Sequence, residues 1–175
     1  PLRPYTPDVS IVSKDNTCSV PKDMVKELYG KEGIKRVFGR MFAYDIPAKV
    51  NGVEKKVMLI SYESYQMNWV DEERWASDRI GFEQVVKDRD EGYVLVSHNE
   101  QNNIKDGDVI STSLGDLTVA ATLYVCPFSG DEDTVVLVCS EALFTKLTGE
   151  TDYTIIDIQL SLGASEEDVE AIRAY

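Results

Sequence analysis

The two ends of this chain carry the same short pattern, and a long stretch of a different kind separates them. Residues 8–13 alternate apolar and polar side chains, and helical spacing begins near Pro21. Residues 153–160 form a second strand-like run, followed by Ser165 and another helical stretch. Alternation with a period of two is typical of a half-buried strand. The pattern predicts an α+β domain split by an insertion, with the two terminal strands in one sheet.

The middle of the chain is rich in short strand-like runs separated by turn residues. Asn51-Gly52 tolerates positive φ and favours a type I′ hairpin. Residues 63–90 follow no clear strand pattern. Short strands between turns predict a small twisted sheet or barrel. The runs cover residues 34–50, 56–62, 93–97, 108–113, 117–126 and 134–138.

Composition excludes some classes of partner. Among 175 residues, 31 are Asp or Glu and 18 are Lys or Arg, so the net charge is −13. This charge would repel a phosphate backbone, and we expect no nucleic-acid partner. The richest apolar run, residues 134–144, is shorter than the roughly 20 residues of a spanning helix. At 43% apolar residues, the chain can bury a core without a metal or disulfide.

The sequence assembles no recognisable catalytic or cofactor site. His98 is the only histidine and lies in a polar, loop-like run, so it is a weak candidate for a nucleophile's base. A zinc site would need it together with Cys18, Cys126 and Cys139, which lack the close pairing of zinc modules. No phosphate-binding glycine loop is present either. We therefore expect no enzyme activity, no metal and no cofactor.

The acidic pairs could be functional sites or ordinary turn residues, and the cysteines could form a disulfide or stay as free thiols. Asp106 and Asp108, like residues 131–133, could ligate calcium or act as an acid and base, but turn chemistry explains them better. Residues 117–126 and 134–138 predict a hairpin around Gly130-Asp131. In that hairpin Cys126 and Cys139 would be offset, which favours free, buried thiols over a disulfide.

The order of these elements resembles a known family. The segments that carry the resemblance are residues 34–50, the strand 93–97 ending in Val96-Ser97, the turn 105–110 around Gly107-Asp108, and the closing strand 153–160. Together they are similar to the MacB-like periplasmic core domain of FtsX/MacB-type ABC transporter permeases. The similarity covers nearly the whole chain and lies in the order of the segments.

The resemblance implies a fold and a location. The fold would be a split, Porter-like α+β subdomain, residues 1–64 and 150–175, with an inserted β-rich, Sabre-like subdomain, residues 65–149. Such a domain lies outside the cytoplasmic membrane, between two membrane-spanning helices of the permease. We therefore expect this chain to be a soluble fragment of a membrane protein.

The resemblance also implies a non-catalytic role in transport. Family members couple ATP hydrolysis by a cognate ATPase subunit, through the membrane part, to movements that act on a peptide, a lipoprotein or a cell-envelope protein. The full transporter can be a dimer. Tyr65, Trp69 and Trp75 form a cluster of large aromatics outside the regular strands, and we expect them to contact that partner. Packing between subdomains is the competing interpretation of these three side chains.

Two other classes of protein stay open at this point. One is an extracytoplasmic hydrolase that uses paired carboxylates. The other is a free-standing secreted binding module. Membrane-spanning segments on both sides of this stretch would favour the permease over either alternative.

Overall fold

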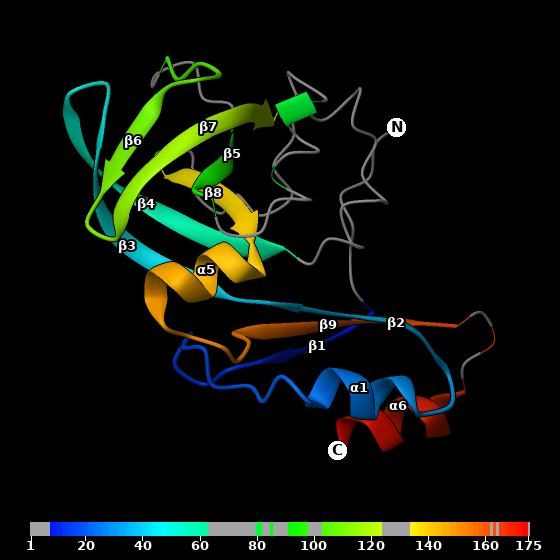
Figure 1. Ribbon diagram of the computed structural model, residues 1–175. Helices are drawn as coiled ribbons and strands as arrows, with labels where there is room; N and C mark the ends of the chain where they lie inside the picture. The colour runs from blue at the N-terminus through cyan, green and yellow to red at the C-terminus, as the bar shows by residue number, and fades with distance from the viewer. Residues whose placement is uncertain are drawn as a thin grey trace. The chain divides into compact units, whose positions relative to one another are not determined.

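The structure is a computed structural model, and it describes residues 8–62, 80, 81, 85, 91–97, 103–123, 134–161, 163 and 165–174 (Figure 1). The chain divides into two units, Pro1–Arg40 with Thr151–Tyr175, and Met41–Glu150. It therefore passes into the second unit after Arg40 and returns after Glu150. The sequence had predicted that the boundaries between the two subdomains lie after residues 64 and 149.

The first unit is built on a three-stranded sheet in the order β1-β9-β2, with both pairs antiparallel. Ile158 of β9 lies opposite Val9 on one side and Val37 on the other. The expectation that the first and last strands share a sheet is confirmed. Figure 1 shows helices α1 and α6 on the same side of this sheet. The elements are β1 (Val9–Val12), α1 (Met24–Tyr29), β2 (Ile34–Arg40), β9 (Ile155–Leu160) and α6 (Glu166–Arg173).

A buried carboxylate joins all three strands of the sheet. Asp157 of β9 forms an ion pair with Arg40 of β2, and the hydroxyl of Ser10 in β1 donates to its Oδ1 at 2.7 Å. Asp157 is 2% exposed and Arg40 is 6% exposed. Removing one partner of a buried pair leaves an uncompensated charge, which is strongly destabilising. The three strands are therefore held together by side chains as well as by backbone hydrogen bonds.

The second unit contains a closed barrel in the order β3-β4-β8-β5-β7-β6. The pairs β4·β8 and β5·β7 are parallel, and the others are antiparallel. Helix α5 follows β8 directly. The elements are β3 (Phe42–Val50), β4 (Val53–Tyr62), β5 (Tyr93–Ser97), β6 (Val109–Thr112), β7 (Gly115–Leu123), β8 (Val135–Ser140) and α5 (Glu141–Thr148).

The predicted hairpin between residues 117–126 and 134–138 is wrong. Strand β5 lies between β7 and β8, parallel to the first and antiparallel to the second. Four of its five residues are buried, from Val94 to Ser97, and β8 is buried from Val135 to Cys139. Strands buried on both faces are typical of parallel pairing, because a parallel strand needs cover on both sides. Both β5 and β8 have a strand on each edge, and each takes part in one parallel pair.

A cluster of aliphatic side chains forms the best-defined core of the barrel unit. Its buried members come from β4, β5, β7, β8 and Val85, and they are Ile60, Val85, Leu95, Ala121, Leu123, Val136 and Val138. Gly81 approaches the same region so closely that a Cβ there would lie 1.9 Å from the carbonyl oxygen of Ala120. A side chain at position 81 would force this contact apart.

Turns and helix ends follow the sequence signals. Asn51 and Gly52 have φ of 50° and 82°, as the predicted type I′ turn requires, and Val50 pairs with Val53 across it. Ser165 and Asp168 form a capping box at the start of α6, a pattern that their spacing of three residues allows. Gly149, with φ of 78°, ends α5 in the left-handed conformation that glycine favours.

We predict that Gly39→Ala destabilises the first unit. A Cβ at this position would lie 2.1 Å from Cε2 and 2.3 Å from Cδ2 of the buried Tyr153 ring, so the ring would have to move. Overpacking of this kind costs about 1–3 kcal/mol. The free energy of unfolding, measured by urea denaturation, should fall by that amount.

Gly30→Ala is the matched control for this substitution. A Cβ at Gly30 would meet only the carbonyl oxygen of Glu27, at an ordinary contact distance of 3.5 Å, and its φ of −78° suits any residue. Its effect should stay within about 0.5 kcal/mol. Equal effects of the two substitutions would contradict the role of Gly39.

Candidate interaction site

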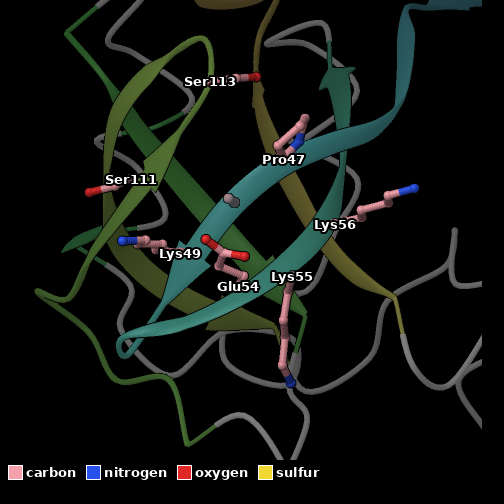
Figure 2. Close-up of a pocket in the computed structure, with 8 residues that line it drawn as sticks. Pro47, Lys49, Glu54, Lys55, Lys56, Ser111 and Ser113 are labelled. Carbon is pink, nitrogen blue, oxygen red and sulfur yellow. The ribbon is translucent and has the colours of Figure 1, made fainter.

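A groove lies on the outward face of the barrel over β3, β4 and β6 (Figure 2). Its volume is about 670 Å³. Buried and exposed residues alternate along β3, so Ile46, Ala48 and Val50 are buried and the residues between them are exposed. The described residues that line the groove are Pro47, Ala48, Lys49, Glu54, Lys55, Lys56, Ser111 and Ser113.

Strand register decides which of these side chains are neighbours. The two-residue turn places Lys49 opposite Glu54 and Pro47 opposite Lys56. On the other side of β3, Lys49 pairs with Ser111, and the backbone N–H of Ser113 donates to the carbonyl oxygen of Pro47 at 2.9 Å. The groove thus spans three adjacent strands, with serine hydroxyls along one side and lysines on the other two strands.

The groove is basic in an acidic protein. The described residues that line it include three lysines and one glutamate, whereas the whole chain carries a net charge of −13. Within the described parts of the chain, neither Lys49 nor Lys56 forms an ion pair. Lysine ammonium groups attract carboxylates and phosphates as point charges. The arrangement can therefore bind an anionic group.

A second, smaller hollow of about 410 Å³ lies at the turn between β3 and β4. The amide of Asn51 donates to the carbonyl oxygen of Asn103 at 3.1 Å and ties this turn to the segment before β6. Lys55 lines both hollows. The other described residues that line the smaller hollow are Val50, Asn51, Val53, Asn103, Lys105 and Asp108.

Asp106 and Asp108 serve the turn before β6. The hydroxyl of Thr122 donates to Oδ1 of Asp106 at 3.1 Å, and the backbone N–H of Lys105 donates to Oδ2 of Asp108 at 2.9 Å. The turn chemistry that the sequence favoured is therefore observed. No group of three or more His, Cys, Asp or Glu side chains with metal-binding geometry occurs in the described ranges.

No family profile matches this sequence, and neither does any curated protein sequence. Solved structures do match. The extracellular domain of the noncanonic ABC-type transporter YknZ from Gram-positive bacteria aligns with a TM-score of 0.59 at 14% identity, over 92% of this chain and 84% of that chain. The chain has the fold of this transporter domain.

Two further solved structures align with this chain. The periplasmic region of MacB from Actinobacillus actinomycetemcomitans aligns with a TM-score of 0.56 at 10% identity, over 94% of this chain and 72% of that chain. A domain assigned to a permease of Porphyromonas gingivalis gives 0.57 at 13%, over 90% and 70%. The resemblance predicted from the sequence is thus confirmed at the level of the fold. Among the described residues, no helix has the length and apolar character needed to cross a bilayer.

The aromatic residues predicted from the sequence to contact a partner lie outside the part of the chain that the structure describes. Tyr65, Trp69 and Trp75 lie outside the described residues, as do His98 and Cys126. The acidic run 131–133 lies outside them too.

Sequence reasoning missed the groove lysines. The Asn51-Gly52 turn was recognised, and counting outward from it would have paired Pro47 with Lys56 and Lys49 with Glu54. The contribution of β6 had no comparable signal, because Ser111 reaches Lys49 through a pairing between strands far apart in the sequence.

The two described cysteines form no disulfide, and they differ in environment. Burial raises the pKa of the Cys139 thiol far above its ordinary value, and a backbone hydrogen bond with Phe144 opposes this only in part. Cys18 is half-buried, with its Sγ 3.3 Å from the hydroxyl of Thr154. The expectation of a free, buried thiol is confirmed for Cys139.

We predict that iodoacetamide at mildly alkaline pH modifies Cys18 in the folded protein and spares Cys139. The thiolate is the reactive form, and a raised pKa removes it. Peptide mass spectrometry can assign the modification to each cysteine. In concentrated urea both should react. Modification of Cys139 at the rate of Cys18 under native conditions would contradict its burial.

Proposed function

We propose that this chain is a non-catalytic, extracytoplasmic domain of an ABC transporter permease. It relays ATP-driven motion to a substrate or protein partner outside the cytoplasmic membrane. The observation that carries the proposal is the fold shared with the YknZ extracellular domain over 92% of the chain. In this proposal a cognate ATPase subunit binds and hydrolyses ATP on the other side of the membrane.

The way the barrel is inserted supports a relay. The first unit contains β1, near the start of the described chain, and α6, near its end. The chain leaves that unit after Arg40, at the end of β2, and returns to it at Thr151, shortly before β9, and β2 and β9 are hydrogen-bonded neighbours. We propose that membrane helices drive the first, Porter-like unit, and that the second, Sabre-like unit contacts the partner.

The base of this attachment is stiff. Arg40, the last residue of β2, forms its buried ion pair with Asp157 of β9, and its carbonyl oxygen accepts the backbone N–H of Thr154 at 2.8 Å. Close-packed elements transmit displacement with little internal give. A movement of the first unit would thus act on both chain connections together, which is what a relay requires.

The proposed role is mechanical and not enzymatic. The groove on the barrel offers lysines, one glutamate and two serines, a set suited to holding an anion. We propose a peptide, a lipoprotein or a cell-envelope protein as the partner, and a dimer as one form of the full transporter. The net charge of −13 argues against nucleic acid.

We predict that removing the barrel from the full-length transporter uncouples it. Residues 41–150 would be replaced by a short Gly-Ser linker, which is feasible because β2 and β9 are paired at that end. ATPase activity in membranes should persist, while export or partner activation should be lost. Export at the parental rate, or loss of ATPase activity at normal protein levels, would contradict the relay.

We further propose that Tyr65, Trp69 and Trp75 contact the partner. Replacing Trp69 and Trp75 by alanine in the full-length transporter should impair export while ATPase activity persists, since a few aromatics often dominate an interface. Tyr29→Ala, at a 45% exposed aromatic in the first unit, is the control and should leave export unchanged. If the tryptophan variant unfolds the isolated chain, the two side chains belong to the core.

A further inference from the structure

We propose that the groove over β3, β4 and β6 binds an acidic polypeptide segment in an extended conformation. The carboxylates of this segment would contact Lys49 and Lys56, and its backbone would lie along the side formed by Ser111 and Ser113. The proposal concerns the chain by itself and does not depend on its assignment to a transporter.

Charge is the first argument. The described residues that line the groove include more lysines than glutamates, so the rest of the chain carries more negative charge than the total of −13. An acidic segment is therefore repelled by most of the protein and attracted here, which selects the groove as its docking place. Within the described residues Lys49 and Lys56 have no competing ion pair, so neither must give up an internal partner to bind.

Spacing is the second argument. Because Lys49 faces Glu54 and Lys56 faces Pro47, the two lysines are diagonal neighbours on adjacent strands. Diagonal neighbours lie about 7–8 Å apart. An extended chain rises about 3.3 Å per residue, so side chains two residues apart on one face are separated by nearly the same distance. The long lysine side chains can also reach carboxylates four residues apart.

The direction of the lysines argues against a single phosphate. Figure 2 shows Lys49 directed toward Ser111 and Lys56 directed to the opposite side of the groove. Two diverging ammonium groups suit two separate carboxylates better than one compact anion. An anionic membrane surface is disfavoured as well, because its field acts on the whole protein, whose net charge of −13 it repels.

The groove floor suits a peptide backbone with small neutral residues between its acids. Pro47 has no N–H, and Ala48 is buried, so the floor between the lysines is apolar. Lysine stems extend this apolar surface while their charged ends stay in water. Glu54 lies opposite Lys49 and repels a carboxylate above it, so the bound segment should carry a neutral residue there.

The test uses the whole chain and a short fluorescent peptide in which glutamate alternates with threonine. Fluorescence anisotropy should show binding that weakens as salt rises. Lys49→Glu with Lys56→Glu should weaken it about tenfold, since two exposed attractions become repulsions. Glu54→Gln should strengthen it. The control Lys14→Glu makes the same kind of charge change at an exposed lysine of the first unit and should have little effect.

Three outcomes would overturn the proposal. One is the absence of binding at low salt, and another is equal weakening by the groove variant and by Lys14→Glu. The third is lysine-dependent binding to phosphatidylglycerol vesicles without binding to the peptide. Urea denaturation of each variant checks its folding. Should the glutamate variant unfold, Lys49→Gln with Lys56→Gln takes its place, and it should weaken peptide binding by a smaller factor.

Discussion

Strand β9 holds the first unit together because it is paired on both edges. It joins β1, the first strand that the structure describes, to β2, after which the chain enters the barrel unit. Asp157 in this strand accepts a hydrogen bond from Ser10 and forms the buried ion pair with Arg40, so one carboxylate serves both neighbours. Losing β2 or β9 would leave one buried charge of this pair without its partner, which proteins tolerate poorly, and losing β1 would remove a hydrogen bond from the same carboxylate. The barrel can be inserted without weakening this sheet because its two connections start from adjacent strands.

Burial is distributed unevenly around the barrel. Some strands are buried along most of their length, and others expose one face that a partner could contact. Strands β5 and β8 are buried along most of their length and take part in the parallel pairs. From Ile46 onward β3 buries alternate residues, and residues 53–56 at the start of β4 are exposed or half-buried, so the outward side chains there are accessible to a partner. The groove lies on that half-exposed side. Its lysines stand on strands whose other face belongs to the core, so they are held on a rigid support.

The proposed relay and the proposed groove are compatible. Motion that enters through the first unit would reach the barrel through two neighbouring connections, and a partner bound to the barrel would be displaced with it. A salt-sensitive ionic contact is suited to a partner that must be released, because exposed charge pairs are individually weak. Aromatic contacts from Tyr65, Trp69 and Trp75 would add the less salt-sensitive part of such an interface.

The sequence by itself determined the local structure and the class of fold. Positive φ at Asn51 and Gly52, the capping box of Ser165 and Asp168, and the turn at Gly107 depend on neighbouring residues, so they could be predicted. The split α+β order, and the likeness to a transporter domain, followed from the succession of these elements. The strand pairing of the barrel did not follow, and the hairpin expected between residues 117–126 and 134–138 was wrong.

Only the tertiary structure decided which strands are neighbours and where the units divide. Residues 34–50 look like one continuous β-rich run, yet Met41 separates two units within it. Its backbone N–H and carbonyl oxygen both bond to Ser61, far along the chain. The groove likewise depends on β6 meeting β3, which brings Ser111 beside Lys49. Strand pairing and the boundary between the units depend on how much apolar surface is buried and how many backbone groups are hydrogen-bonded across the whole chain. No local run of residues encodes that total.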